Sequence, residues 1–130
     1  MYSSYKILVV DDHKLSQKVL STQLQTIGFD NIQSTSSGQE ALGLLEVQKF
    51  DIVMFDLMMP EMDGFQFLQE CKKNNYFKTT AFMLSSADAD ENNIMDILSE
   101  GAVSYITKPI FQEELKSKIQ KVISWLEKQS

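Results

Sequence analysis

Five polar residues in this sequence are of the types that could carry out phosphoryl chemistry together. They are Asp11, Asp12, Asp56, Ser85 and Lys108, and each lies just past the end of a short apolar run. Crowded carboxylates repel one another unless a cation lies between them, and hard oxygen ligands that leave room for water suit Mg²⁺. The metal would offset the charge of a nucleophilic Asp56, while Ser85 and Lys108 can contact the oxygens of an incoming phosphoryl group. The set indicates phosphoryl transfer to a carboxylate.

The apolar runs before these residues predict strands of a parallel sheet. They are short and continuous, as is typical of strands buried on both faces. The carboxyl ends of parallel strands share one edge, and open α/β sheets place their ligands there. Each polar residue alone fits a helix cap or a loop equally well, so their joint position at one edge is what indicates a site. The runs are Ile7–Val10, Ile52–Phe55, Ala81–Leu84 and Ser104–Ile106.

Between these runs the apolar residues recur at helical spacing. A first helix is expected through Leu15–Ile27, with Gly28 as its left-handed end. Ser37 followed by Glu40 fits a capping box for a second helix, after a weaker strand around Ile32. Further helices are expected over residues 65–73, from Ile94 to Gly101, and along a stripe from Phe111 to Leu126. Five strands alternating with five helices predict one doubly wound α/β domain over residues 1–130.

Composition and charge argue against nucleic-acid and membrane binding. Hydrophobic residues make up 43% of the 130, enough for a core without metal or disulfide staples. Twelve basic and eighteen acidic residues give a net charge of −6, which is opposite to the basic footprint that nucleic acid requires. The apolar runs are far shorter than the ~20 residues that span a bilayer. Because the single cysteine, Cys71, also fits a reducing compartment, we expect a cytoplasmic protein.

Three segments resemble the receiver domains of two-component response regulators, and chemotaxis-regulator-like single-domain receivers in particular. The resemblance covers essentially the whole chain, and the segment that begins at Asp56 is its most specific motif. It implies a flavodoxin-like (βα)₅ fold with a five-stranded parallel sheet in the order 2-1-3-4-5. The segments are Ile7-Leu8-Val9-Val10-Asp11-Asp12, Asp56-Leu57-Met58-Met59-Pro60-Glu61-Met62-Asp63-Gly64 and Gly101-Ala102-Val103-Ser104-Tyr105-Ile106-Thr107-Lys108-Pro109.

The resemblance assigns a role to each acidic residue of the site. Asp56 would be the phosphoacceptor, beside a Mg²⁺ ion for which Mn²⁺ can substitute. Asp12 would bind the metal directly and Asp11 through water, while Met58 would supply a backbone carbonyl. Lys108 would hold the phosphoryl group.

The resemblance also implies a conformational switch. Ser85 stands where the family has Thr or Ser, and it would turn inward to contact the phosphoryl group. Tyr105 stands where the family has an aromatic residue that changes rotamer on activation. The surface formed by the fourth helix, fifth strand and fifth helix would then shift from one pre-existing conformation toward another. Met58 and Ala87 occupy positions that modulate the dephosphorylation rate, and Ser86, where Ala is more usual, removes no catalytic group.

The partners that the resemblance implies are proteins. A sensor histidine kinase or a histidine phosphotransfer protein would donate the phosphoryl group, and a downstream effector protein would bind the switched surface. A phosphorylation-linked homodimer stays open. The protein would not be an enzyme acting on a separate substrate, since it would catalyse only its own phosphorylation and autodephosphorylation.

Three other functions are weighed against this interpretation. A receiver fold could bind partners without phosphorylation, but the complete set of five polar residues argues against such a module. A hydrolase of the haloacid dehalogenase type needs a second Asp two residues after its nucleophile, and residue 58 is Met. A flavin-binding electron carrier shares the alternation of strands and helices, yet the acidic edge would repel the phosphate of a flavin.

Several other residues are set aside as structural. His13, the only histidine, is expected to be exposed at the start of the first helix, with no role as phosphodonor or ligand. Trp125 is expected to be partly buried, at the edge of the apolar stripe of the last helix. The methionines near Asp56 are expected to fill gaps in the core or an interface rather than to bind a soft metal, since their neighbours are hard carboxylates. They are Met54, Met58, Met59 and Met62.

Overall fold

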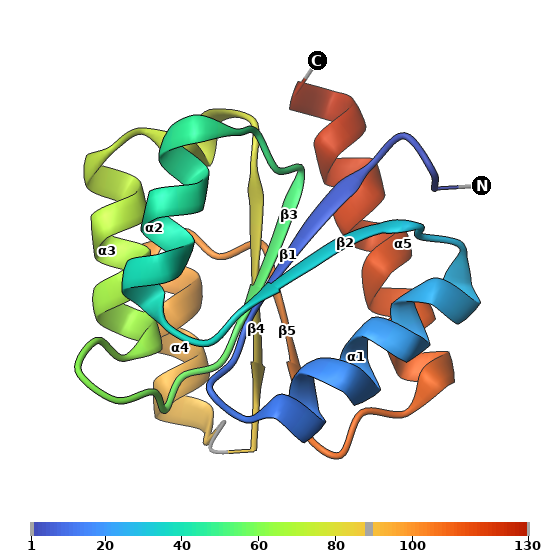
Figure 1. Ribbon diagram of the computed structural model, residues 1–130, viewed down its shortest axis with the longest axis horizontal. Helices are drawn as coiled ribbons and strands as arrows, with labels where there is room; N and C mark the ends of the chain where they lie inside the picture. Colours follow the sequence, from blue (N-terminus) through green and yellow to red (C-terminus); the bar gives the residue numbers. More distant parts are fainter. Residues whose placement is uncertain (1, 88–89, 130) are drawn as a thin grey trace.

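The fold is a five-stranded parallel sheet between two groups of helices (Figure 1). The computed structural model describes residues 2–87 and 90–129. The strand order is β2-β1-β3-β4-β5, and all four neighbouring pairs are parallel, which confirms the predicted doubly wound α/β class and strand order. The elements are β1 Lys6–Val10, α1 Lys14–Ile27, β2 Asn31–Thr35, α2 Gly38–Val47, β3 Ile52–Phe55, α3 Gly64–Lys73, the 3₁₀ turn η1 Tyr76–Lys78, β4 Ala81–Ser86, α4 Glu91–Glu100, β5 Ser104–Thr107 and α5 Gln112–Gln129.

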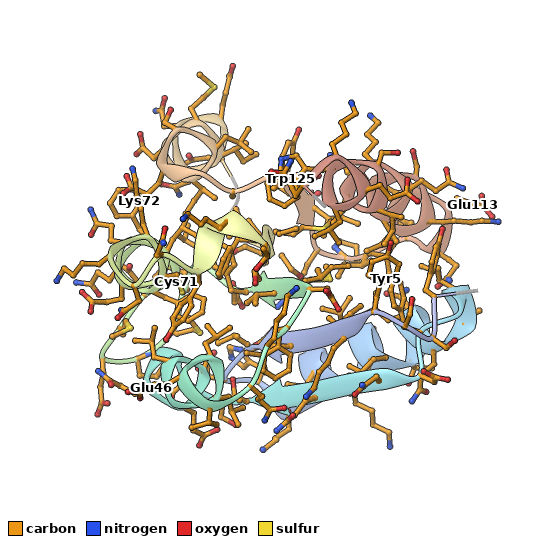
Figure 2. All side chains as sticks on the ribbon, turned by 90° about the horizontal axis from the view of Figure 1, so that it is seen from above. Tyr5, Glu46, Cys71, Lys72, Glu113 and Trp125 are labelled. Carbon is orange, nitrogen blue, oxygen red and sulfur yellow. The ribbon has the colours of Figure 1, made fainter. Side chains whose placement is uncertain are left out.

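Alternate residues of the central strands supply two separate cores. In β3, Val53 and Phe55 pack with α2, α3 and α4 on one face, whereas Ile52 and Met54 pack with α1 and α5 on the other. Figure 1 shows these two helix groups on opposite sides of the sheet, and Figure 2 shows them again from above. The period of two along a strand explains the division, because neighbouring side chains point to opposite faces. Cys71, labelled in Figure 2, is fully buried in the first core.

The helix ends follow the expected chemistry with one difference. Gly28 has a φ of 131°, a conformation that favours glycine, and it ends α1 as predicted. At the start of α2 the Ser37 hydroxyl accepts a hydrogen bond from the Glu40 amide at 3.1 Å. The Glu40 carboxylate bonds the Ser36 amide instead of that of Ser37, so the predicted capping box is only half formed. A complete box begins α3, between Asp63 and Gln66.

Three further details differ from or refine the expectations. Strand β4 runs on through Ser85 and Ser86, where the sequence suggested that it would end. Phe111 precedes α5 with 66% of its surface exposed, so it does not belong to the buried stripe of that helix. Trp125, labelled in Figure 2, is half-buried against the core that α5 covers, as expected. None of the helices in the described ranges is long and apolar enough to span a bilayer.

Candidate functional site

The sheet register brings the strand-end residues together. Val10 and Leu84 both pair with Phe55, so the residues that follow them, Asp11 and Ser85, lie level with Asp56. The side chains before them belong to the core under α2, α3 and α4. Because neighbouring side chains alternate, Asp11, Asp56 and Ser85 share the face that α1 and α5 cover. This row lies at the carboxyl edge of the sheet, at the bottom of Figure 1, as the sequence predicts.

Lys108 is the cation of this edge. Its ammonium lies 2.7 Å from Asp11 Oδ2 and 3.1 Å from Asp56 Oδ2, and it also donates to the Ser16 hydroxyl at 3.3 Å. Burial by itself would lower the pKa of Lys108, but the hydrogen bonds to the two carboxylates outweigh it and raise that pKa. Asp11 and Asp56 are 4% and 6% exposed, so their contacts with this ammonium offset part of the cost of burying two carboxylates. The Lys108–Pro109 peptide bond beside them is cis.

Two residues that sequence reasoning missed fix the Asp11 end of the row. The buried Gln17 amide donates to the carbonyls of Asp11 and Thr35 at 2.6 and 3.0 Å, which ties α1 to the ends of β1 and β2. Ser16, one residue earlier, contacts Lys108. Both belong to the first turn of α1, and nothing in their type or spacing distinguishes them in the sequence from other polar helix residues.

Asp12 and His13 complete an acidic cluster with Asp11 and Asp56. One ligand atom from each of the four residues lies within 4.8 Å of all the others. The His13 Nδ1 atom is 3.2 Å from Asp12 Oδ1 and 3.5 Å from Asp11 Oδ1, although 69% of the His13 side chain is exposed. The sequence placed His13 at the start of α1, where it is the N-cap, but not its ring among the carboxylates.

The oxygens of this cluster suit a hard divalent cation. Asp12 Oδ1 is buried and has no hydrogen-bond partner among the described residues. Buried polar atoms of this kind normally have a hydrogen-bond partner, so this carboxylate oxygen is available to bind a cation. Carboxylate oxygens with open positions for water fit Mg²⁺.

Ser85 carries a second unsatisfied atom in the same row. The residue is 3% exposed, and its hydroxyl has no hydrogen-bond partner within residues 2–87 and 90–129. A buried hydroxyl without a partner costs roughly 1–3 kcal/mol. A ligand oxygen above Asp56 would give Ser85 the partner it lacks.

The loop after Asp56 is held close to the sheet by Gly64. The Gly64 amide donates to the Leu57 carbonyl at 2.7 Å. A Cβ at this position would stand 2.5 Å from the Asp56 carbonyl oxygen and 2.8 Å from Leu57 Cα, so only glycine permits this approach. Within the loop Met58 is 57% exposed. It lines a surface pocket of about 280 Å³ together with His13, Ser16, Asp56, Ser86, Ala87 and Lys108.

Tyr105 lies one strand away from this pocket. It pairs with Leu84 in the register of β4 and β5, while Ser85 pairs with Ile106, so Tyr105 lies one register position before Ser85 and its side chain packs on the opposite face of the sheet, with the core under α2, α3 and α4. Tyr105 is half-buried, and the Lys118 ammonium lies 3.8 Å from the centre of its ring. The structure therefore brings Asp11, Asp12, Asp56 and Lys108 into one cluster, with Ser85 level with Asp56 on the next strand. Asp56 and Lys108 line the pocket together with Met58 and Ala87, whereas Tyr105 lies on the edge strand β5.

Comparison with known proteins identifies a family and solved structures to which this chain is similar. Residues 7–120 match the family described as "Response regulator receiver domain". "Probable chemotaxis protein CheY" of Rhizobium etli is 33% identical over 121 residues, which cover 93% of this chain and 94% of that protein. The structure of Vibrio cholerae chemotaxis protein CheY4 superposes with a TM-score of 0.82 at 27% identity, over 91% of this chain and 98% of the other.

A longer relative matches nearly the whole of this chain over part of its own length. "Probable transcriptional regulator ycf27" of Porphyridium aerugineum is 35% identical over 125 residues, or 96% of this chain. The chain spans only 50% of that relative's length.

Proposed function

The chain belongs to the response regulator receiver domain family of two-component signalling, and we propose that it is a receiver switched by phosphorylation of Asp56. The donor is the phosphohistidine of a sensor histidine kinase or a histidine phosphotransfer protein. The observation that carries the proposal is the row of Asp11, Asp56 and Ser85 with the Lys108 ammonium bonded to both carboxylates. Such a protein acts in the cytoplasm on no separate substrate.

The transfer step uses one carboxylate oxygen of Asp56. It attacks the phosphorus of the phosphohistidine, a P–O bond forms as the P–N bond breaks, and the leaving imidazole nitrogen keeps the bonding electron pair. Lys108, already within 3.1 Å of Asp56, would exchange part of its contact with that carboxylate for a phosphoryl oxygen. The unsatisfied Ser85 hydroxyl would donate to another.

The residues around Asp56 fit a Mg²⁺ or Mn²⁺ ion. Asp12 and Asp56 would bind it directly, Asp11 through water, and Met58 through its backbone carbonyl. When bound, the ion supplies positive charge that offsets the negative charge of the carboxylates and of the phosphoryl group. Asp11 keeps its bond to Lys108 in this arrangement and so orients the ammonium toward Asp56.

Phosphorylation would be transmitted from Ser85 to Tyr105. When Ser85 turns toward the phosphoryl group, Tyr105, one register position earlier on the neighbouring strand β5, would move toward the core. The α4–β5–α5 surface then shifts between two states that exist beforehand, and a downstream effector protein binds one of them better.

The donor protein would dock on an apolar patch next to the acidic pocket. This patch lines a hollow of about 250 Å³ and consists of Leu15, Val19, Pro109 and Ile110. Leu15 and Val19 are 75% and 45% exposed. Ser16 and Lys108 line both the hollow and the acidic pocket, so a protein seated on the patch could present its phosphohistidine to Asp56. Exposed apolar side chains grouped in this way are typical of protein interfaces.

The experiment that tests this function is intact mass spectrometry after incubation with acetyl phosphate. We expect the wild type to gain one phosphoryl group only when Mg²⁺ is present, and Asp56→Asn to gain none under the same conditions. A phosphorylation-independent interaction module is the alternative, and a wild type that gains no phosphoryl group and binds no Mg²⁺ would favour it.

A further inference from the structure

We propose that His13 is an additional ligand of the metal site, so that the site favours a first-row transition cation such as Co²⁺ over Mg²⁺ more strongly than its oxygen ligands alone would. The inference rests on the metal site of the proposed function and deepens it, because it names the class of cation that this chain's own residues favour. The imidazole would widen the preference for such cations that carboxylate oxygens alone already show.

The position of the His13 ring carries the proposal. Nδ1 lies 3.2 Å from Asp12 Oδ1 and 3.5 Å from Asp11 Oδ1, inside the group of four ligand atoms that lie within 4.8 Å of one another. The ring is not needed to begin α1, since His13 is the N-cap but its side chain makes no capping hydrogen bond. The backbone amide of His13 donates to Asp11 Oδ1 at 2.9 Å and fixes the residue at the pocket mouth.

A second observation at this place is an unsatisfied acceptor. Asp12 Oδ1 is buried and makes no hydrogen bond within the described ranges, and a bound cation would give it a partner. Among the described residues the cluster holds the carboxylates of Asp11, Asp12 and Asp56, whereas the Lys108 ammonium contacts only Asp11 and Asp56, so negative charge is in excess. A divalent cation matches that excess.

The chemistry of the ligands decides which cation binds best. Mg²⁺ is a hard ion that prefers oxygen and keeps several waters, so an imidazole nitrogen adds little to its affinity. Imidazole suits later first-row metals, whose affinity for mixed nitrogen and oxygen sites rises along the series from Mn²⁺ to Cu²⁺. A site of Asp12, Asp56 and His13 is of this mixed kind.

The test is calorimetric titration of Co²⁺ into the full chain, with Mg²⁺ added as competitor. We expect His13→Asn to bind Co²⁺ at least about tenfold more weakly than the wild type, because the loss of a metal-site residue commonly costs that much affinity. The Mg²⁺ affinity, obtained from displacement of Co²⁺, should be equal in the two proteins. Because His13 is the only histidine, a paramagnetically shifted imidazole proton in the Co²⁺ complex can arise only from it.

A matched control separates the site from any exposed histidine. The double variant His13→Asn, Lys18→His keeps one exposed imidazole on α1 but moves it along the helix. It should bind Co²⁺ as weakly as His13→Asn, and Asp56→Asn should also weaken Co²⁺ binding. Far-ultraviolet circular dichroism checks that each variant remains folded.

Three results would overturn the inference. One is equal Co²⁺ affinity in wild type and His13→Asn; another is Co²⁺ binding that Mg²⁺ does not displace; the third is full affinity in the double variant. If Mg²⁺ still binds in those cases, only the role of His13 fails. A wild type that binds neither ion would contradict the metal site of the proposed function as well.

Discussion

The close approach of Gly64 to Asp56 leads to a quantitative prediction for Gly64→Ala. The new Cβ would stand 2.5 Å from the Asp56 carbonyl oxygen and 2.8 Å from Leu57 Cα, whereas real Cβ contacts essentially never fall below 3.0 Å. Both neighbours are backbone atoms, so the start of α3 or the Asp56–Leu57 backbone must move by at least about half an ångström. Overpacking of this kind costs about 1–3 kcal/mol.

The same movement weakens a hydrogen bond. The Gly64 amide would lose its 2.7 Å bond to the Leu57 carbonyl, which adds about 1 kcal/mol. We therefore expect Gly64→Ala to lower the free energy of unfolding by about 2–4 kcal/mol. Gly43→Ala is the matched control: Gly43 lies inside α2 with nothing within 4 Å of a new Cβ, so this variant should gain about 0.5–1 kcal/mol from helix propensity.

Urea unfolding of the two variants and the wild type measures these differences. We also expect the rate of phosphorylation by acetyl phosphate to fall by about tenfold in Gly64→Ala, because a small displacement of a reacting group is costly. The rate in Gly43→Ala should not change. A Gly64→Ala variant as stable and as reactive as the wild type would refute the reasoning from the close contact.

Three further predictions concern the pocket and the switch. The raised pKa of Lys108 means that its ion pairs stabilise the fold fully below roughly pH 10 and lose that effect as pH rises through the folded-state pKa. In urea unfolding at several pH values, Lys108→Met should reduce the alkaline loss of stability without abolishing it, because the raised pKa values of Tyr5, Cys71 and Tyr76 also lower the stability as pH rises. An unchanged profile would contradict this. Met58→Asn and Ala87→Glu change two residues that line the pocket, and each should alter the lifetime of the phosphorylated protein, measured as loss of the phosphoryl mass over time. Unchanged decay would reject the role of these two positions in dephosphorylation. Lys118→Met removes the cation that lies against the Tyr105 ring, a contact worth about 0.5–1 kcal/mol. If this contact restrains the ring, the population of Tyr105 turned toward the core should rise about two- to fivefold, as measured by NMR of labelled tyrosine, and an unchanged population would contradict the prediction.

The sequence predicts the fold and the strand-end residues because both depend on local patterns. Apolar runs followed by Asp11, Asp56 and Ser85 can pair in a parallel sheet in only a few ways, and each places the polar residues at one edge. Phe111 shows the limit of such patterns: it fits the apolar stripe of α5 by spacing, yet the helix begins after it and the side chain stays exposed.

The finer geometry of the site depends on contacts across the chain. The direction of the His13 ring and the bond from Gln17 to the ends of two strands depend on how α1 packs. The contact of Gly64 with Asp56 depends on how tightly the loop closes. No periodicity or spacing in the sequence encodes these contacts, because each joins residues whose relative position is fixed only in the folded chain.

The central claim is that Asp56 itself receives the phosphoryl group, and reductive trapping tests it most directly. Borohydride reduces an acyl phosphate to an alcohol, so phosphorylated Asp56 would become homoserine, which peptide sequencing by mass spectrometry locates. We predict homoserine at position 56, only after incubation with Mg²⁺ and acetyl phosphate. Homoserine at another position, or none in a protein that has gained a phosphoryl group, would contradict the account.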